Sequence, residues 1–165
     1  MRYSGGDADD VVFLGTIIGV LATDLLLGVA IGVATKFFAV GAIVPHVEPG
    51  VGAIATQALV NPFYGIDGMT LLRAGLSAAE TMARLQELDA GAEARQVHMI
   101  DARGRSVAHT GATCVDWAGH LVGDGYSVAG NMLAGEQVVR TTFQAFASAA
   151  GKPRAERFLL AREAG

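Results

Sequence analysis

Residues 16–36, TIIGVLATDLLLGVAIGVATK, decide how the rest of the chain can fold. This stretch can be interpreted as a membrane span, as a signal sequence or as two buried strands. A helical span needs about 20 consecutive apolar residues, but Asp24 interrupts the apolar run that begins at Val11, and the next run ends at Lys36. Burying Asp24 near mid-bilayer costs about 2.5–3.5 kcal/mol, which is tolerable. A membrane anchor over residues 11–35 therefore stays open as a minority alternative.

The strand interpretation fits the stretch better. A signal peptide requires a basic segment before its apolar core, whereas three aspartates occupy residues 7–10. Apolar runs without alternation are typical of strands buried on both faces. We therefore expect strands over about 16–23 and 29–36, joined by a turn that begins at Asp24.

Length and composition indicate one domain with a real core. The chain has 165 residues and a net charge of −4, and its arginines and lysines are scattered, so we expect no nucleic-acid partner. The single cysteine, Cys114, excludes an intramolecular disulfide and is compatible with a reducing compartment. We expect a cytoplasmic protein, with secretion or membrane attachment left open. The apolar composition, 52% hydrophobic, also favours a homo-oligomer that buries apolar surface.

The remaining elements follow in two groups. After an irregular segment over 37–47, a buried strand is expected at 52–59, followed by a helix at about 66–74. A second helix is expected to begin at the capping box Ser77–Glu80 and to end at about Leu88. On this second helix, Met82, Leu85 and Leu88 share one face.

The second group begins with a hairpin. Strands at 96–100 and 106–110 flank the turn 101–104. A short strand at 126–129 precedes a helix at about 135–149, and Pro153 starts a last helix. This order predicts an α+β fold with stacked sheets between helical layers.

Two long segments resemble a known family. ATKFFAVGAIVPHVEPGVGAIATQALVNPFYG (34–65) and RQVHMIDARGRSVAHTGATCVDWAGHLVGDGYSVAGNMLAG (95–135) are similar to bacterial proteins of domain-of-unknown-function family 1028. The resemblance extends over about 17–150. The family is grouped with the N-terminal-nucleophile (Ntn) hydrolases, which implies a four-layer αββα sandwich but no settled activity. On this basis residues 1–15 are a leader and 16–165 a single domain.

The chain departs from the family at both ends. Relatives begin close to the first strand, often with a threonine just after the initiator methionine, and they continue beyond the equivalent of Gly165 with a segment containing Gly-Asp-Arg-Gly. These differences leave open whether the sandwich is complete at its C-terminus.

The resemblance makes Thr16 the expected catalytic nucleophile. In Ntn hydrolases the first residue attacks an amide and its own α-amino group is the base, so the Gly15–Thr16 bond would have to be cut. Lys36 is expected to lower the pKa of the nucleophile or to stabilise charge, and the Asn131 amide to stabilise an oxyanion. The alternatives are a core threonine, a lysine whose ammonium reaches solvent, and a capping asparagine.

Five further residues are candidates for binding a small amide or peptide-like substrate. They lie at strand ends or in the loops that follow, where sites collect: Thr56, Gln57, Asn61, His109 and Asp124. Each also has a structural alternative, such as loop architecture for Asn61, a backbone bond for His109 and turn chemistry for Asp124.

No cofactor is expected. His109, Cys114, Asp116 and His120 lack the short paired spacing of a zinc site, and the glycine-rich segments match no nucleotide motif, so we predict neither metal nor nucleotide. Two other functions compete with amide hydrolysis. One is a non-catalytic binding or assembly protein on the same fold, since the leader acylates the amine of Thr16. The other is the membrane-anchored protein.

Overall fold

The computed structural model describes residues 44–165. The leader, both strands expected at 16–23 and 29–36, and the candidate residues Thr16 and Lys36 lie outside the described residues. Within 44–165, no helix has both the length and the apolar character needed to cross a membrane.

An antiparallel sheet forms the centre of the described part. Its four strands are β1 (Pro45–Glu48), β2 (Gly52–Ala58), β3 (Arg95–Asp101) and β4 (Ser106–Thr110), in that order across the sheet. The predicted strands at 52–59, 96–100 and 106–110 are therefore confirmed to within a residue or two. Neighbouring strands along the chain pair with one another, as expected when short turns connect them.

Strand β1 differs from the sequence prediction. The prediction of an irregular segment over 37–47 is wrong for its last residues, because Pro45 pairs with Ala55 and His46 with Ile54. A proline is acceptable here because it is the first residue of a strand at the edge of the described sheet, where an absent N–H costs little.

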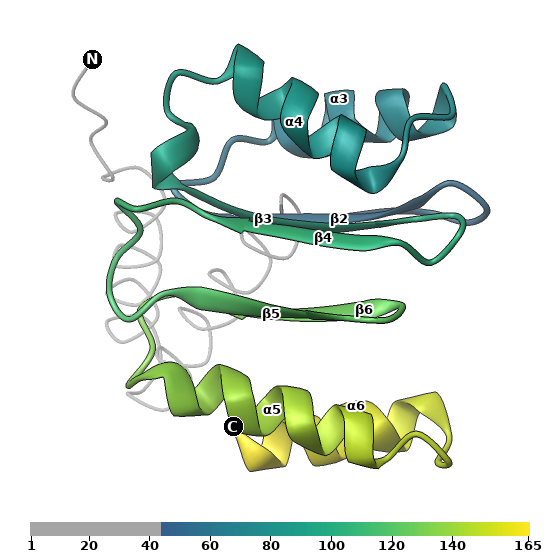
Figure 1. Ribbon diagram of the computed structural model, residues 1–165, viewed down its shortest axis with the longest axis vertical. Helices are drawn as coiled ribbons and strands as arrows, with labels where there is room; N and C mark the ends of the chain where they lie inside the picture. The colour runs from purple at the N-terminus through teal and green to yellow at the C-terminus, as the bar shows by residue number, and fades with distance from the viewer. Residues whose placement is uncertain (1–43) are drawn as a thin grey trace, which may run out of the picture. The chain divides into compact units, whose positions relative to one another are not determined.

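Two helices cover one face of this sheet (Figure 1). Helix α3 (Phe63–Arg73) begins three residues before its predicted start. The Asn61 Oδ1 atom accepts a hydrogen bond from the Phe63 N–H (3.1 Å), which supports the early start. Helix α4 (Ala78–Leu88) begins at the predicted capping box: the Glu80 N–H donates to Ser77 Oγ (3.2 Å), and the Ser77 N–H donates to Glu80 Oε2 (2.8 Å).

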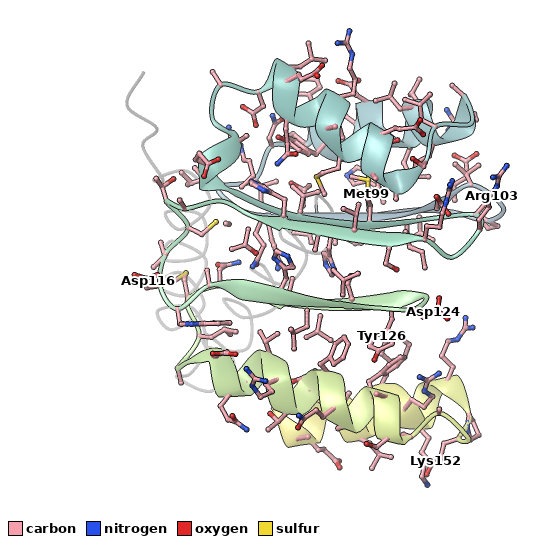
Figure 2. The ribbon with its side chains drawn as sticks, in the orientation of Figure 1. Met99, Arg103, Asp116, Asp124, Tyr126 and Lys152 are labelled. Atoms are coloured by element: carbon pink, nitrogen blue, oxygen red, sulfur yellow. The ribbon has the colours of Figure 1, made fainter. Side chains whose placement is uncertain are left out.

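The apolar core lies between these helices and the sheet. Val97 and Met99 alternate along β3 on the helical side and are 0% and 2% exposed; Figure 2 shows Met99 on that side. The core contains Ile54, Tyr64, Met69, Leu72, Ala78, Met82, Leu85, Val97 and Met99. The prediction that Leu88 shares the buried face of α4 is wrong: it is the last helical residue and is 69% exposed.

A β-hairpin and two more helices lie on the other side of the sheet. Strand β5 (Gly119–Gly123) pairs with β6 (Tyr126–Gly130) as a separate two-stranded sheet. Helix α5 (Glu136–Ser148) packs on both strands, and α6 (Arg154–Ala164) packs on α5. In the described residues the order is thus helices, sheet, sheet, helices (Figure 1). Strand β5 was not predicted.

Aromatic rings hold α5 and α6 to β6. The Tyr126 ring lies with its centroid 4.9 Å from that of Phe143 and 4.8 Å from that of Phe146, and Phe146 is 5.2 Å from Phe158. Helix α5 buries Val139 and Phe146, whereas Ala150 lies beyond the helix and is exposed. Aromatic pairs at these separations stabilise a fold beyond the area that they bury.

Gly111→Ala is expected to destabilise the protein by about 1–3 kcal/mol. A Cβ atom at this buried position would lie 2.2 Å from the Glu93 carbonyl oxygen, which belongs to the backbone and cannot rotate away. Urea unfolding of the variant measures the loss. Gly151→Ala is the control, since nothing lies within 4 Å of its Cβ position. Equal stability of the two variants would contradict this packing.

Candidate functional site

A cluster of polar side chains lies between the two sheets. We call it the inter-sheet cluster and define it as Gln57, Gln96, Thr110, His120 and Asn131. Gln96 stands opposite Gln57 on β2 and Thr110 on β4, so all three project from one face of the sheet. His120 comes from β5, and Asn131 directly follows β6. The cluster therefore links the two sheets through side chains rather than through apolar packing alone.

Gln96 is the centre of this cluster and is fully buried. Its Oε1 atom accepts from Gln57 Nε2 (2.6 Å) and Asn131 Nδ2 (3.0 Å). Its Nε2 atom lies within hydrogen-bond distance of Thr110 Oγ1 (3.0 Å) and of two carbonyl oxygens of the second sheet, those of Gly119 (3.1 Å) and Gly130 (2.9 Å). A buried amide needs such partners because an unpaired polar group is costly.

Two histidines belong to the same inter-sheet space. The Thr110 hydroxyl is 2.8 Å from His120 Nδ1, and the Ser127 hydroxyl is 2.7 Å from His98 Nδ1. Burial lowers the pKa of His98, with a smaller contribution from the nearby His120. Burial likewise lowers the pKa of His120, and the nearby His109 lowers it further by a smaller amount. Both imidazoles are therefore biased toward the neutral form, in which each can accept or donate a proton.

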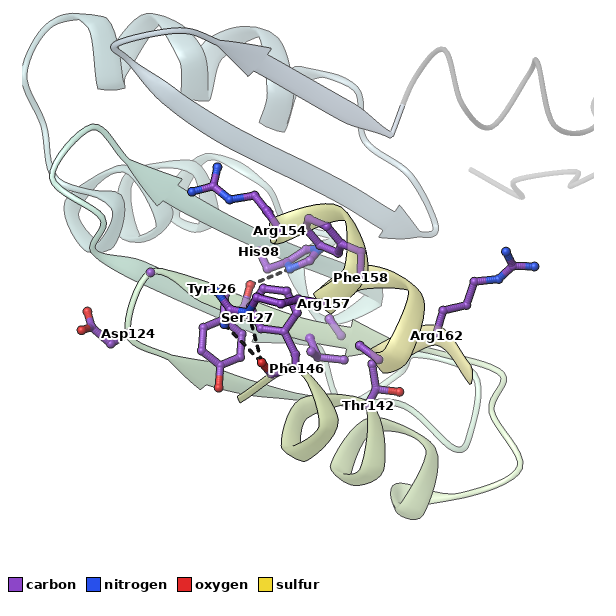
Figure 3. Close-up of a pocket in the computed structure, with 14 residues that line it drawn as sticks. His98, Asp124, Tyr126, Ser127, Thr142, Phe146, Arg154, Arg157, Phe158 and Arg162 are labelled. Carbon is purple, nitrogen blue, oxygen red and sulfur yellow. Dashed lines mark hydrogen bonds between the residues drawn. The ribbon is translucent and has the colours of Figure 1, made fainter. Parts of the chain in front are cut away.

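The His98–Ser127 pair borders a cavity. The cavity measures about 550 Å³ and is lined by β6, α5 and α6, with His98 entering from the first sheet (Figure 3). A hydroxyl hydrogen-bonded to a neutral imidazole is an arrangement that can activate a nucleophile or orient a ligand. This cavity and the inter-sheet cluster together form the candidate functional site.

Of the sequence-predicted site residues that the structure describes, two come together in the inter-sheet cluster. Gln57 and Asn131 meet through Gln96. Thr56 faces the helical side of the sheet, is fully buried, and donates only a long bond to the Asn61 carbonyl (3.5 Å). Asp124 is exposed in the β5–β6 turn at the margin of the cavity.

His109 also lies away from the inter-sheet cluster. It stands opposite Val97 on the helical side of the sheet, and its Nε2 atom is 3.0 Å from the Ala92 carbonyl oxygen. This is the hydrogen bond to the backbone that is expected if His109 has a structural role. Cys114 is buried, its Sγ donates to the Arg95 carbonyl (3.4 Å), and burial raises the pKa of the thiol. In residues 44–165, no three His, Cys, Asp or Glu side chains form a metal-ligating group.

Asn61 is hydrogen-bonded to an ion pair at the end of α4, formed by Asp89 and Arg95, which we call the clamp. Its Nδ2 donates to Asp89 (3.3 Å), whose carboxylate also accepts from the Gly91 N–H (2.9 Å) and from Arg95 Nε (2.9 Å). Arg95 Nη1 donates in addition to the Leu59 carbonyl (2.6 Å). The bond from Arg95 lowers the pKa of Asp89 to about 2, against an opposing effect of burial. Asn61 therefore acts in loop architecture in this structure.

Asp89→Asn is expected to lower stability at neutral pH by more than at acid pH. The folded-state pKa of about 2 lies below the ordinary value of 3.8, so the contribution of the carboxylate is fully present above that ordinary value and is lost as pH falls toward 2. Urea unfolding at pH 7, 5 and 3 measures the difference between variant and wild type. Asp67→Asn, an exposed aspartate on α3, is the control. A deficit in Asp89→Asn that stays constant across these pH values would contradict the clamp.

Sequence reasoning did not single out Gln96, His98 or Ser127. The available signal was the alternation of Gln96 and His98 with Val97 and Met99 along β3. Such alternation predicts one apolar and one polar face, and a polar face is ordinarily expected to meet solvent. Here it meets a second sheet.

Comparison with known proteins places the chain in a family. The model of DUF1028, a family of unknown function, matches residues 16–165, and the chain belongs to this family. A crystal structure of protein SPO2555 from Silicibacter pomeroyi, also of DUF1028, is similar: it is 28% identical with a TM-score of 0.70 over 76% of this chain. The chain spans 58% of that protein's length. A search of curated proteins found no match.

Proposed function

We propose that the protein is an Ntn-type amide hydrolase whose nucleophile is Thr16. One observation carries the proposal: the family match begins at Thr16, the residue that such a mechanism requires at the start of the mature chain. The order of helices, sheet, sheet and helices in the described residues supports it, because this is the layering expected of the Ntn fold.

The proposal includes the fold, a four-layer αββα sandwich of the Ntn type in which residues 16–36 form two strands joined by a turn. In support, residues 44–165 contain two antiparallel sheets and four helices.

The proposed chemistry runs in two stages. In the first, Thr16 Oγ attacks the Gly15 carbonyl, and its proton passes to the Thr16 nitrogen as the Gly15–Thr16 C–N bond breaks, which frees the α-amine. Water then hydrolyses the resulting ester, which releases residues 1–15 and restores the Thr16 hydroxyl. In the second, this amine takes the proton of Oγ as the oxygen attacks a substrate amide. The C–N bond of the substrate breaks, its amine leaves with that proton, and water hydrolyses the acyl-enzyme.

Asn131 and Gln57 have groups that such a reaction can use. Each donates one side-chain N–H to Gln96, and a primary amide carries two N–H donors. The second N–H of Asn131 is the one that we assign to the oxyanion. A donor held in place by a buried partner needs no reorganisation during the reaction, which makes its electrostatic effect larger.

Labelling of the purified full chain with a threonine-reactive β-lactone tests the proposal. Peptide mass spectrometry is expected to find the adduct on Thr16, at the new N-terminus, and on no other residue. Thr16→Ala should abolish labelling. Thr70→Ala, which removes an exposed hydroxyl on α3 that bonds only to its own helix, should leave labelling unchanged. An unlabelled wild-type chain would favour the non-catalytic alternative.

That alternative, a binding or assembly protein on the same fold, has its own support. The amides of Gln57, Gln96 and Asn131 bond to one another, as a purely structural cluster would. We also propose self-association, because Phe158 and Leu159, at adjacent positions of α6, expose 60% and 57% of their surface. Light scattering should give the mass of an oligomer, and the mass of a monomer would refute this.

A further inference from the structure

The cavity between β6, α5 and α6 carries an excess of positive charge. Three arginines line it, Arg154, Arg157 and Arg162, and its one carboxylate is Asp124. In Figure 3 the side chains of Asp124, Arg154 and Arg162 all reach outward from the cluster of rings, in different directions. Three guanidinium groups against one carboxylate give the lining an excess of positive charge, so the cavity favours an anionic ligand.

Arg157 is fixed in position but keeps free donors. Its Nε (3.3 Å) and Nη2 (3.1 Å) donate to the Phe146 carbonyl oxygen, and its guanidinium lies 3.9 Å from the centroid of the Phe146 ring. A guanidinium has five N–H donors, so three remain for a ligand. Arg154, the first residue of α6, makes neither a hydrogen bond nor an ion pair with any described residue and is exposed.

The rest of the wall is mainly aromatic and apolar. Tyr126, Phe146 and Phe158 pack in series, with ring centroids 4.8 and 5.2 Å apart. Val128, Ala129 and Ala161 complete the apolar surface, and His98 and Ser127 supply a hydrogen-bonded polar pair. Concave apolar sites with a few fixed polar groups are typical of small-molecule binding.

We propose that this cavity binds a small organic carboxylate with an apolar, aromatic-sized body. The carboxylate lies against Arg154 and Arg157, and the body packs on the rings of Phe146 and Phe158. A carboxylate fits better than a phosphate, because a dianion loses more hydration on entering an apolar cavity. This binding is independent of the reaction proposed for Thr16 and stands if that reaction is absent.

Calorimetric titration of the full chain with 3-phenylpropionate tests the site. Saturable binding with Kd below about 1 mM is expected. Acetate, which lacks the apolar body, and 3-phenylpropanamide, which lacks the charge, should bind at least about tenfold more weakly. Arg154→Ala should weaken 3-phenylpropionate binding at least about fivefold, because it removes one guanidinium. Arg103→Ala is the control: this arginine is exposed in the β3–β4 turn and outside the cavity.

Four results would overturn the proposal. The first is equal affinity for 3-phenylpropionate and its amide, which would show that charge is not recognised. The second is equal binding by Arg154→Ala and Arg103→Ala, and the third is the absence of saturable binding by the wild-type chain. The fourth is tighter binding of phenyl phosphate, which would assign the cavity to a different anion. Matching thermal unfolding of both exposed-arginine variants and the wild type establishes that the comparison concerns folded protein.

Discussion

A chain that begins at Thr16 is expected to hydrolyse amide substrates at least about a thousandfold faster than the same chain carrying Thr16→Ala. The alanine variant keeps the α-amine but lacks the oxygen that forms the acyl-enzyme, so the loss falls on kcat. Releasing Thr16 from a cleavable fusion partner supplies the free amine directly. Hydrolysis is then measured on a panel of N-acyl anilides, whose released amine is coloured.

Two controls separate chemistry from folding. Thr16→Ser keeps a hydroxyl nucleophile and should retain measurable turnover, while Thr70→Ala should retain all of it. Equal rates for the chains with threonine and alanine at residue 16 would remove this residue from the mechanism, whatever happens to residues 1–15 in the full chain. A rate that depends instead on Ser127→Ala would assign the chemistry to the His98–Ser127 pair.

Gln96→Leu is expected to lower the free energy of unfolding by about 3 kcal/mol or more. Leucine is close to glutamine in size, so the space is kept while the hydrogen bonds are lost. The Gln57 and Asn131 amides lose their shared acceptor, and the carbonyls of Gly119 and Gly130 lose a donor. Each buried polar group left without a partner costs about 1–3 kcal/mol.

Urea unfolding, compared with that of Gln144→Leu, measures this loss. Gln144 is exposed on α5, and substitutions at such positions usually change stability by no more than about 0.5 kcal/mol. If Gln96→Leu is as stable as Gln144→Leu, the inter-sheet cluster does not hold the two sheets together.

Local signals predicted much of the described fold. The Ser77–Glu80 capping box located the start of α4 to the residue, because its two reciprocal hydrogen bonds involve only neighbours. The turn at 101–104 likewise located the β3–β4 hairpin. Strands β1 and β5 were missed because their pairing depends on partners: Pro45 discourages a strand until β2 lies beside it, and β5 is fixed by its register with β6.

The candidate site was less accessible to sequence reasoning. Gln57 and Asn131 were predicted separately and lie 74 residues apart in the sequence (131 − 57). Only the fold brings both side chains to Gln96. The cavity depends on α6 packing against α5, and nothing in the local sequence of Arg154 or Arg157 indicates that packing. Side-chain direction across two sheets is a tertiary property, and periodicity within one strand cannot supply it.

The intact mass of the purified full chain after long incubation tests the central claim most directly. The proposal predicts that the wild-type mass falls by that of residues 1–15, leaving Thr16 as the N-terminal residue, and that Thr16→Ala keeps its full mass under the same conditions. A wild-type chain that retains Met1 or Arg2 as its first residue would contradict self-cleavage, and with it the assignment of Thr16 as the nucleophile of this chain.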